Sequence, residues 1–427
     1  MNNYTKHTLS NGLELITVPL PHVDSVTVMV MVGAGSRYET KSTNGIAHFL
    51  EHMTFKGSQK RPSSLAISSE IDAIGGEFNA FTGKDHTGFY IKARAKHTPL
   101  LIDVLGDMIL HPLLKPEEIE REKGVIIEEI NMYEDTPMRH IGDVYENLLY
   151  GDTPLGWDTA GKAEIIRKIT RQDFVNYIND LYKPNNAIIV VAGRVHSSQF
   201  VVEKLIEKTL SDWKKGVTKQ YIKQSDKQDK GALKINYKKT EQAHIALGVR
   251  AYSLDHPKKY ALSILSAILG GGMSSRLFIE VRERRGLAYY VHADASQYQD
   301  VGNFVVQAGV DVNRIDEAIK VILEQFKAIA DKKLPITLAE LSKTKEYLKG
   351  RTTLDLEDSR SVAAFYGTQE ILKRKIITPQ DFFAKLDKIS MDDIYAVAQE
   401  IFLDNKFNLA IIGPYQNAKR FEKIIGE

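Results

Sequence analysis

The chain has 427 residues, of which 43% are hydrophobic and 26% are charged, a composition typical of soluble globular proteins. At roughly 100–200 residues per domain, this length predicts two or more domains. The 57 basic and 55 acidic residues leave a net charge of +2, which indicates neither a nucleic-acid-binding nor a membrane-binding surface. Because cysteine is absent, disulfides, thiolate metal sites and cysteine nucleophiles are excluded.

The amino-terminal segment, residues 1–21, has no basic stretch followed by an apolar core, so it is not typical of a secretory signal. The longest apolar stretch, around Val26–Val32, is far too short to cross a bilayer. We therefore expect a cytoplasmic, prokaryotic protein that binds neither a membrane nor nucleic acid.

Strand and helix patterns alternate through the first half of the chain. The predicted elements, in order, are strands at His7–Leu9, Leu13–Val18 and Ser25–Val32, helices near Asn44–Phe55 and Ser63–Ile74, strands at Glu77–Thr82 and Thr87–Ala93, helices at Thr98–Leu110 and from Pro116 to about Tyr133, and a strand at Ala187–Ala192. Asn11-Gly12 is a typical hairpin turn between the first two strands.

A polar segment rich in Lys, Gln and Asp, residues 216–232, follows and is predicted to be a linker between domains 1–215 and 233–427. Beyond it the same order of elements recurs. The repeated elements are Ala243–Val249, Tyr260–Leu269, Phe278–Gly286, Ala288–Ser296, Gly302–Ala308, Ile315–Ile329 and Asn408–Gly413. The repeat predicts two similar α+β domains, each a mostly antiparallel sheet with helices packed on it.

One short segment of the first predicted helix carries metal-site chemistry. Residues four apart lie on one face of a helix, so His48 and His52 can bind one ion through their imidazoles. Glu51 lies on nearly the same face and can reach a water molecule bound to that ion. This arrangement is the inverted form of His-Glu-x-x-His, and it predicts a catalytic zinc ion, one per chain.

A catalytic zinc site needs a third protein ligand, and the helix that begins at Pro116 offers candidates. At about 100° per residue, Glu122 and Glu129 fall on the flank of its apolar face, whereas Glu128 points to the opposite side. A carboxylate beside an apolar face is costly unless it is paired or bound to metal. We therefore expect Glu129 or Glu122 to serve the metal. The alternative is that the histidines are structural or simply exposed.

The segment His-Phe-Leu-Glu-His-Met-Thr-Phe-Lys-Gly, which begins at His48, resembles the signature of the pitrilysin-type inverzincins. The likeness is greatest to the mitochondrial processing peptidase β-subunit and its bacterial single-chain relatives, and it covers essentially the whole chain. In that family 76 residues separate the second histidine from the third ligand. Residues 53–128 number 76, which implies Glu129 as that ligand. The resemblance also implies that Glu122 helps to orient a histidine ligand.

The predicted strand Glu77–Thr82 is, by sequence alone, an ordinary half-buried strand. The resemblance implies more, because in the family the matching strand lies at a sheet edge beside the metal. An extended peptide would add to that edge through backbone hydrogen bonds. Asn79, Ala80 and Phe81 are therefore expected to bind substrate.

The second half has no counterpart of the histidine pair. Its glycine-rich segment, Gly270–Leu277, contains no metal ligands and no following Walker lysine. By sequence alone, Arg282 and Tyr289 belong to a basic helix end and the strand after it. The resemblance implies instead that they hold the scissile carbonyl and stabilise the oxyanion, with the two domains forming a clamshell around an enclosed chamber.

The resulting hypothesis is a zinc metalloendopeptidase that hydrolyses short or unfolded polypeptides and acts as a homodimer. One alternative is a non-catalytic core or scaffold subunit of the same fold. A second is one half of a heterodimeric processing peptidase, although this chain carries both the zinc and the Arg/Tyr features. A third is a zinc hydrolase that acts on a non-peptide amide.

Overall fold

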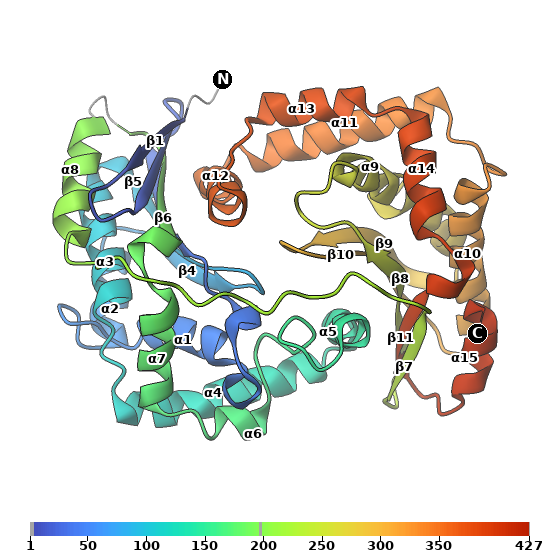
Figure 1. Cartoon of the computed structure of the whole chain (residues 1–427), viewed down its shortest axis with the longest axis horizontal. Helices are drawn as coiled ribbons and strands as arrows, with labels where there is room; N and C mark the ends of the chain where they lie inside the picture. The colour runs from blue at the N-terminus through green and yellow to red at the C-terminus, as the bar shows by residue number, and fades with distance from the viewer. Residues whose placement is uncertain (1–3, 196–198, 427) are drawn as a thin grey trace. The chain divides into compact units, whose positions relative to one another are not determined.

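The computed structural model describes residues 4–195 and 199–426 (Figure 1). They pack into two compact units, and each unit is assembled from three stretches of the chain. Unit 1 comprises Met1–Ile130, Asp158–Ile222 and Thr353–Thr378. Unit 2 comprises Asn131–Trp157, Lys223–Thr352 and Pro379–Glu427.

Unit 1 contains a six-stranded sheet in the order β1-β2-β6-β3-β5-β4. The strands are β1 (Thr5–Thr8), β2 (Glu14–Pro19), β3 (Ser25–Val32), β4 (Glu77–Thr82), β5 (Thr87–Arg94) and β6 (Ala187–Gly193). The helices are α1 (Ile46–Thr54), α2 (Ser64–Asp72), α3 (Thr98–Leu110), α4 (Pro116–Glu134, whose last residues count with unit 2), α6 (Ala163–Ile166), α7 (Arg171–Leu181), α8 (Gln199–Leu210) and α12 (Ser359–Lys373).

Unit 2 contains a five-stranded sheet in the order β7-β11-β8-β10-β9. The strands are β7 (Ala232–Tyr237), β8 (Gln242–Ala251), β9 (Ala288–Gln297), β10 (Gly302–Asp311) and β11 (Asn408–Gly413). The helices are α5 (Pro137–Tyr150), α9 (Lys259–Gly270), the π-helical segment η5 (Phe278–Glu283), α10 (Ile315–Ala330), α11 (Leu338–Asp355, whose last residues count with unit 1), α13 (Pro379–Lys388), α14 (Met391–Ile401) and α15 (Ala418–Ile425).

The predicted duplication and the α+β fold class are confirmed by the two sheets. Apart from β1, their strand orders correspond one to one, with β2, β6, β3, β5 and β4 matching β7, β11, β8, β10 and β9. The parallel pair also falls at the same place, because β2 pairs with β6 and β7 pairs with β11 in parallel. All other strand pairs are antiparallel.

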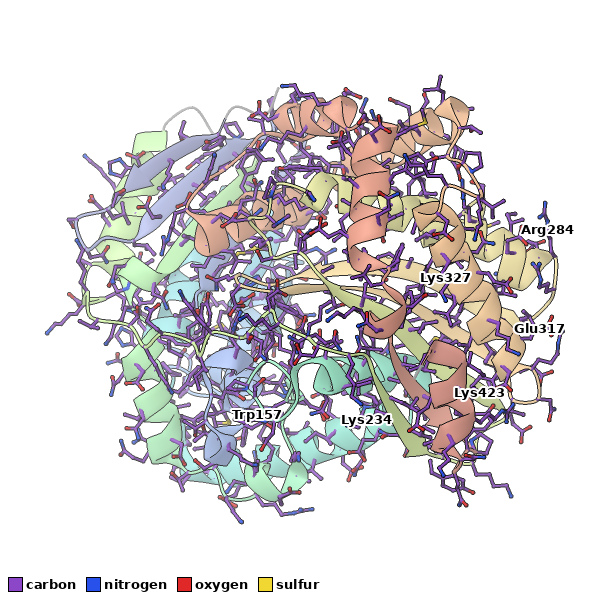
Figure 2. All side chains as sticks on the ribbon, turned by 45° about the vertical axis from the view of Figure 1, so that its right-hand side comes forward. Trp157, Lys234, Arg284, Glu317, Lys327 and Lys423 are labelled. Carbon is purple, nitrogen blue, oxygen red and sulfur yellow. The ribbon has the colours of Figure 1, made fainter. Side chains whose placement is uncertain are left out.

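The central strands of both sheets are buried on both faces, which explains why β3 is almost continuously apolar. In unit 1 the residues Val28 and Val30 of β3 point to a core shared with α1 and α3, whereas Met29 and Met31 point to α12. In unit 2 the helices α9, α10 and α14 cover one face, and α5 covers the other. The exposed side chain of Glu317 on α10 lies at the right-hand margin of the view (Figure 2).

The composition of the units differs from the continuous domains 1–215 and 233–427 that the sequence predicts. Helix α12 comes from the second half of the chain but packs on β6, β3 and β2 of unit 1 (Figure 1). Helix α5 comes from the first half but packs on β11 and β8 of unit 2. The two halves therefore exchange a helix. The predicted linker, 216–232, is shortened by one residue because β7 begins at Ala232.

No helix in the described ranges has both the length and the apolar character that crossing a bilayer would require.

Because the two halves exchange a helix, a core mutation in α5 or α12 should destabilise a sheet whose strands come mainly from the other half of the sequence. Tyr366 of α12 and Tyr145 of α5 are both fully buried. Replacement of either by alanine should cost about 3 kcal/mol through the cavity left behind. Tyr366→Ala should speed amide hydrogen exchange in β2, β3 and β6, and Tyr145→Ala should speed it in β8, β10 and β11. Faster exchange confined to the half of the sequence that carries each mutation would contradict the exchange of helices.

Candidate metal centre

One side of helix α1 is apolar and packs in the core of unit 1, and another side carries two histidines. Phe49 and Leu50 are fully buried, and the ring of Phe49 meets that of Phe174 edge-on with centroids 4.9 Å apart. Because His48 and His52 are four residues apart, they leave the helix on one face, and their ring centroids are 4.7 Å apart.

Helix α4 supplies the carboxylates. Its buried isoleucines are Ile119, Ile126 and Ile130. Glu122 lies on the same side and is only 2% exposed, whereas Glu129 is half-buried. Glu128 is exposed, as its helical phase predicts. The rotation of α4 therefore brings Glu122 and Glu129, but not Glu128, to α1.

The two helices bring three potential metal ligands together. Glu129 Oε2 lies 3.6 Å from His48 Nε2 and 3.4 Å from His52 Nε2. Four zinc ligands at about 2.0–2.2 Å in a tetrahedron are separated from one another by about 3.3–3.6 Å. Among the residues that the structure describes, these three form the only such group of His, Asp or Glu. Two imidazoles and a carboxylate at these separations fit a zinc ion, with one tetrahedral position left for water or substrate.

Glu122 contacts the ring nitrogen of His52 that does not face Glu129. Its Oε1 is 2.9 Å from His52 Nδ1, and its Oε2 accepts a hydrogen bond from Lys56 Nζ at 2.7 Å. Burial would raise the pKa of Glu122, but these two partners outweigh it and lower the pKa. A carboxylate on Nδ1 fixes the tautomer that leaves Nε2 free to bind metal.

The histidines have opposite electrostatic surroundings. Burial lowers the pKa of His48 to about 4, and the neighbouring charge of His52 adds to the effect. Burial also disfavours the charged form of His52, but the carboxylates of Glu122 and Glu129 outweigh it and raise its pKa to about 9. The carboxylates therefore favour a positive charge at this place. A metal ion supplies that charge and allows both imidazoles to be neutral.

Glu51 lies on α1 between the histidines and is 9% exposed. Burial raises its pKa, and a hydrogen bond that Thr82 Oγ1 donates to its Oε2 partly offsets this rise. Thr82 is the last residue of β4, so this bond joins the metal-binding helix to the sheet edge. A carboxylate with a raised pKa beside a metal site is suited to proton transfer.

Strand β4 is the edge strand of its sheet and pairs only with β5 among the described strands. The amide of Ala80 bonds to the side-chain Oδ1 of Asn79, at 2.8 Å. The ring of Phe81 covers Gly88 of β5, where any side chain would collide with it. The open edge of β4 therefore includes Asn79, Ala80 and Phe81. Phe81 immediately precedes Thr82, the residue that bonds to Glu51.

The structure places Arg282 and Tyr289 in unit 2 and brings them together there. Arg282 lies in η5 and Tyr289 in β9, with the guanidinium carbon 5.7 Å from the centre of the tyrosine ring. Tyr289 is 69% exposed, a high value for an aromatic residue in a strand. A cation and a phenol therefore form one exposed group.

Two residues of the centre were missed in the sequence. Lys56 follows His52 by four residues, so helical spacing could have indicated it. Thr82 is two residues after Ala80 and so lies on the same face of β4. Its contact with Glu51, however, depends on how the sheet packs against α1, which no local pattern reveals.

The fold and this centre define a class of two-unit α+β proteins that carry a His-His-Glu site in one unit. Residues 15–162 match the family model described as insulinase (peptidase family M16), and residues 168–348 match the one described as the peptidase M16 inactive domain. The chain is 36% identical to the uncharacterized zinc protease YmxG of Bacillus subtilis, over 96% of this chain and 98% of that protein. It is 35% identical to the uncharacterized zinc protease SCO5738 of Streptomyces coelicolor, over 96% and 89% of the two chains.

The chain therefore belongs to peptidase family M16, as the resemblance to the pitrilysin-type enzymes predicts. Its fold is similar to the crystal structure of a protease from Helicobacter pylori, with a TM-score of 0.90, 27% identity and coverage of 97% of this chain and 100% of that one. The crystal structure of a peptidase M16 inactive domain from Pseudomonas fluorescens shares the fold, with a TM-score of 0.88 at 19% identity and coverage of 97% and 98%.

Replacement of Glu122 by glutamine should weaken zinc binding about 10- to 100-fold, the usual effect of losing the partner of a histidine ligand. A glutamine side chain has one oxygen and one NH2 group. Either His52 or Lys56 would therefore meet a hydrogen-bond donor in place of the carboxylate oxygen that it contacts now. Affinity is measured by competition with a chelator. Glu128→Gln, on the exposed side of the same helix, should bind zinc as the wild type does, and equal affinities in the two variants would contradict the role given to Glu122.

Proposed function

We propose that the protein is a zinc-dependent metalloendopeptidase that hydrolyses peptide bonds in short or unfolded polypeptides. The observation that carries the proposal is the convergence of His48, His52 and Glu129 next to the buried carboxylate of Glu51. The names of the relatives as zinc proteases support it.

His48, His52 and Glu129 would hold the zinc ion. When bound, zinc supplies Lewis-acid chemistry, which polarises a carbonyl and makes water more acidic. The chain itself contributes the orientation of the ligands, because Glu122 fixes the ring of His52 from Nδ1.

Glu51 is the proposed general base and acid. It takes a proton from the attacking water and passes it to the leaving amine. Its burial supports this role, because the raised pKa makes the carboxylate a stronger base than an exposed glutamate. Thr82 donates a hydrogen bond to Oε2 and so orients the carboxylate, and Oε1 is the oxygen that would accept the proton.

The open edge of β4 is the proposed binding surface for the substrate. An extended peptide would add as a further strand, with main-chain hydrogen bonds that depend little on sequence. The amide of Ala80 would exchange the side chain of Asn79 for a carbonyl of the peptide. Most backbone groups of a folded protein are already hydrogen-bonded within it, so this mode favours short or unfolded polypeptides.

Arg282 and Tyr289 are the proposed partners of the scissile carbonyl and of the oxyanion that develops from it. Their support from the structure is the pairing of a guanidinium with an exposed phenol on adjacent elements of unit 2.

The chain could instead be a non-catalytic scaffold subunit or half of a heterodimer. The match to an inactive domain, residues 168–348, contains none of the proposed metal ligands, which all lie within the match to the peptidase model, residues 15–162. Hydrolysis by the purified chain alone, with its molar mass in solution, distinguishes these alternatives from the proposed self-sufficient homodimer.

Glu51→Gln should retain zinc at the wild-type stoichiometry and lose hydrolysis by about 10²- to 10⁴-fold, because an amide cannot accept the proton. Cleavage of an unstructured, internally quenched fluorescent peptide and elemental analysis of the same sample provide the two readouts. Hydrolysis at the wild-type rate would exclude Glu51 as the base.

A further inference from the structure

Glu39 is a buried carboxylate outside the candidate metal centre, and it is only 3% exposed. It accepts three hydrogen bonds. Asn44 Nδ2 and Gly45 N donate to its Oε2 at 2.9 and 2.8 Å, and Ala47 N donates to its Oε1 at 2.9 Å. Burial raises the pKa of Glu39 to about 7, while these donors act in the opposite direction. A buried carboxylate satisfied in this way is a specific structural device rather than a surface residue.

The three donors belong to the start of α1, the helix that carries His48, Glu51 and His52. A helix leaves its first amides without partners, and a polar side chain at the N-cap usually satisfies one of them. Here the N-cap is Gly45, which has a φ of 95° and no side chain. A side chain there would collide with Ala160 and Gly161, so the cap must come from elsewhere.

Glu39 supplies that cap from outside the helix. Its carboxylate satisfies the amides of Gly45 and Ala47 together and places negative charge at the positive end of the helix dipole. Ala47 immediately precedes His48, so the anchored turn is the one from which the first histidine projects.

The same segment also holds the hairpin that follows β4. Ser36 N and Arg37 N donate to the carbonyls of Gly83 and Lys84, both at 3.1 Å. The buried Arg37 side chain pairs with Asp85 at 2.9 Å.

This hairpin begins directly after Thr82, the residue that donates to Glu51. Residues 36–39 therefore contact two parts of the centre. Glu39 binds the start of the metal-binding helix, whereas Ser36 and Arg37 bind the hairpin that follows the strand carrying Thr82. The ring of Tyr221, whose centre lies 3.8 Å from the guanidinium carbon of Arg37, packs over this arginine.

We infer that residues 36–39 form a brace in which Glu39 is a positioning residue: it anchors the amino end of α1 and thereby sets the metal-binding geometry of His48 and His52. The inference rests on the proposed function for its consequence, which is metal affinity. Glu39 itself contacts neither the ligands nor the substrate.

The test uses Glu39→Gln, which keeps the shape of the side chain. Both oxygens of Glu39 accept hydrogen bonds from N–H groups. In either orientation of a glutamine side chain, its NH2 group would face one of these N–H groups, and that hydrogen bond would be lost. Metal-free protein is titrated with Co²⁺, whose visible absorption reports the ligand geometry. The variant should bind Co²⁺ about tenfold more weakly, or weaker still, with an altered spectrum.

Glu370→Gln is the matched control. Glu370 is 1% exposed, pairs with Lys6 and lies on α12, so the same chemical change there should leave the Co²⁺ titration unchanged. If Glu39→Gln does not fold, as judged by circular dichroism, Asn44→Ala removes one of the three donors and should weaken binding in the same direction by a smaller factor. Wild-type affinity and spectrum in the folded Glu39 or Asn44 variant would overturn the inference.

A wild-type chain that binds no Co²⁺ would contradict the proposed function and not the brace. In that case amide hydrogen exchange along residues 46–54 decides. The brace predicts faster exchange in Glu39→Gln than in the wild type, and equal exchange would refute it.

Discussion

The placement of His52 between two carboxylates is the interaction on which the candidate centre depends. Glu122 meets one ring nitrogen and Glu129 approaches the other, so this side chain contacts both carboxylates that α4 brings to α1. Two half-buried or buried carboxylates close to one imidazole favour positive charge, and they raise the pKa of His52 to about 9. A divalent cation bound to Nε2 satisfies the same electrostatic demand while adding His48 and Glu129 as ligands.

The rest of the fold supports that contact in one unit only. Apart from β1, the sheets of both units have the same strand order, yet the metal-ligand group of the described residues lies in unit 1. The exchange of α5 and α12 gives each sheet its second apolar layer from the opposite half of the chain. Loss of the metal-free half would therefore uncover a face of the β2-β6-β3 region, which gives that half a structural reason to be retained.

The sequence predicts those features that depend on local spacing. The histidine pair follows from i,i+4 geometry, helical phase leaves Glu122 and Glu129 as candidates, and the spacing of the family that the chain resembles selects Glu129. The predicted strands lie within a few residues of the observed ones. The helix exchange does not follow, because an amphipathic helix such as α12 shows that one face is buried but not which sheet buries it. Glu39 likewise lies in a polar loop, and its role as the cap of α1 depends on how that loop folds back on Gly45 and Ala47, which no local pattern reveals.

The central claim is that His48, His52 and Glu129 form a catalytic zinc site. Elemental analysis of the purified chain, combined with peptide hydrolysis before and after dialysis against a chelator, tests it most directly. The account predicts one zinc ion per chain, loss of hydrolysis with the metal and recovery on addition of zinc, with no stoichiometric zinc in a His48→Ala variant. Hydrolysis that persists without metal, or zinc that remains bound at full stoichiometry in His48→Ala, would contradict it.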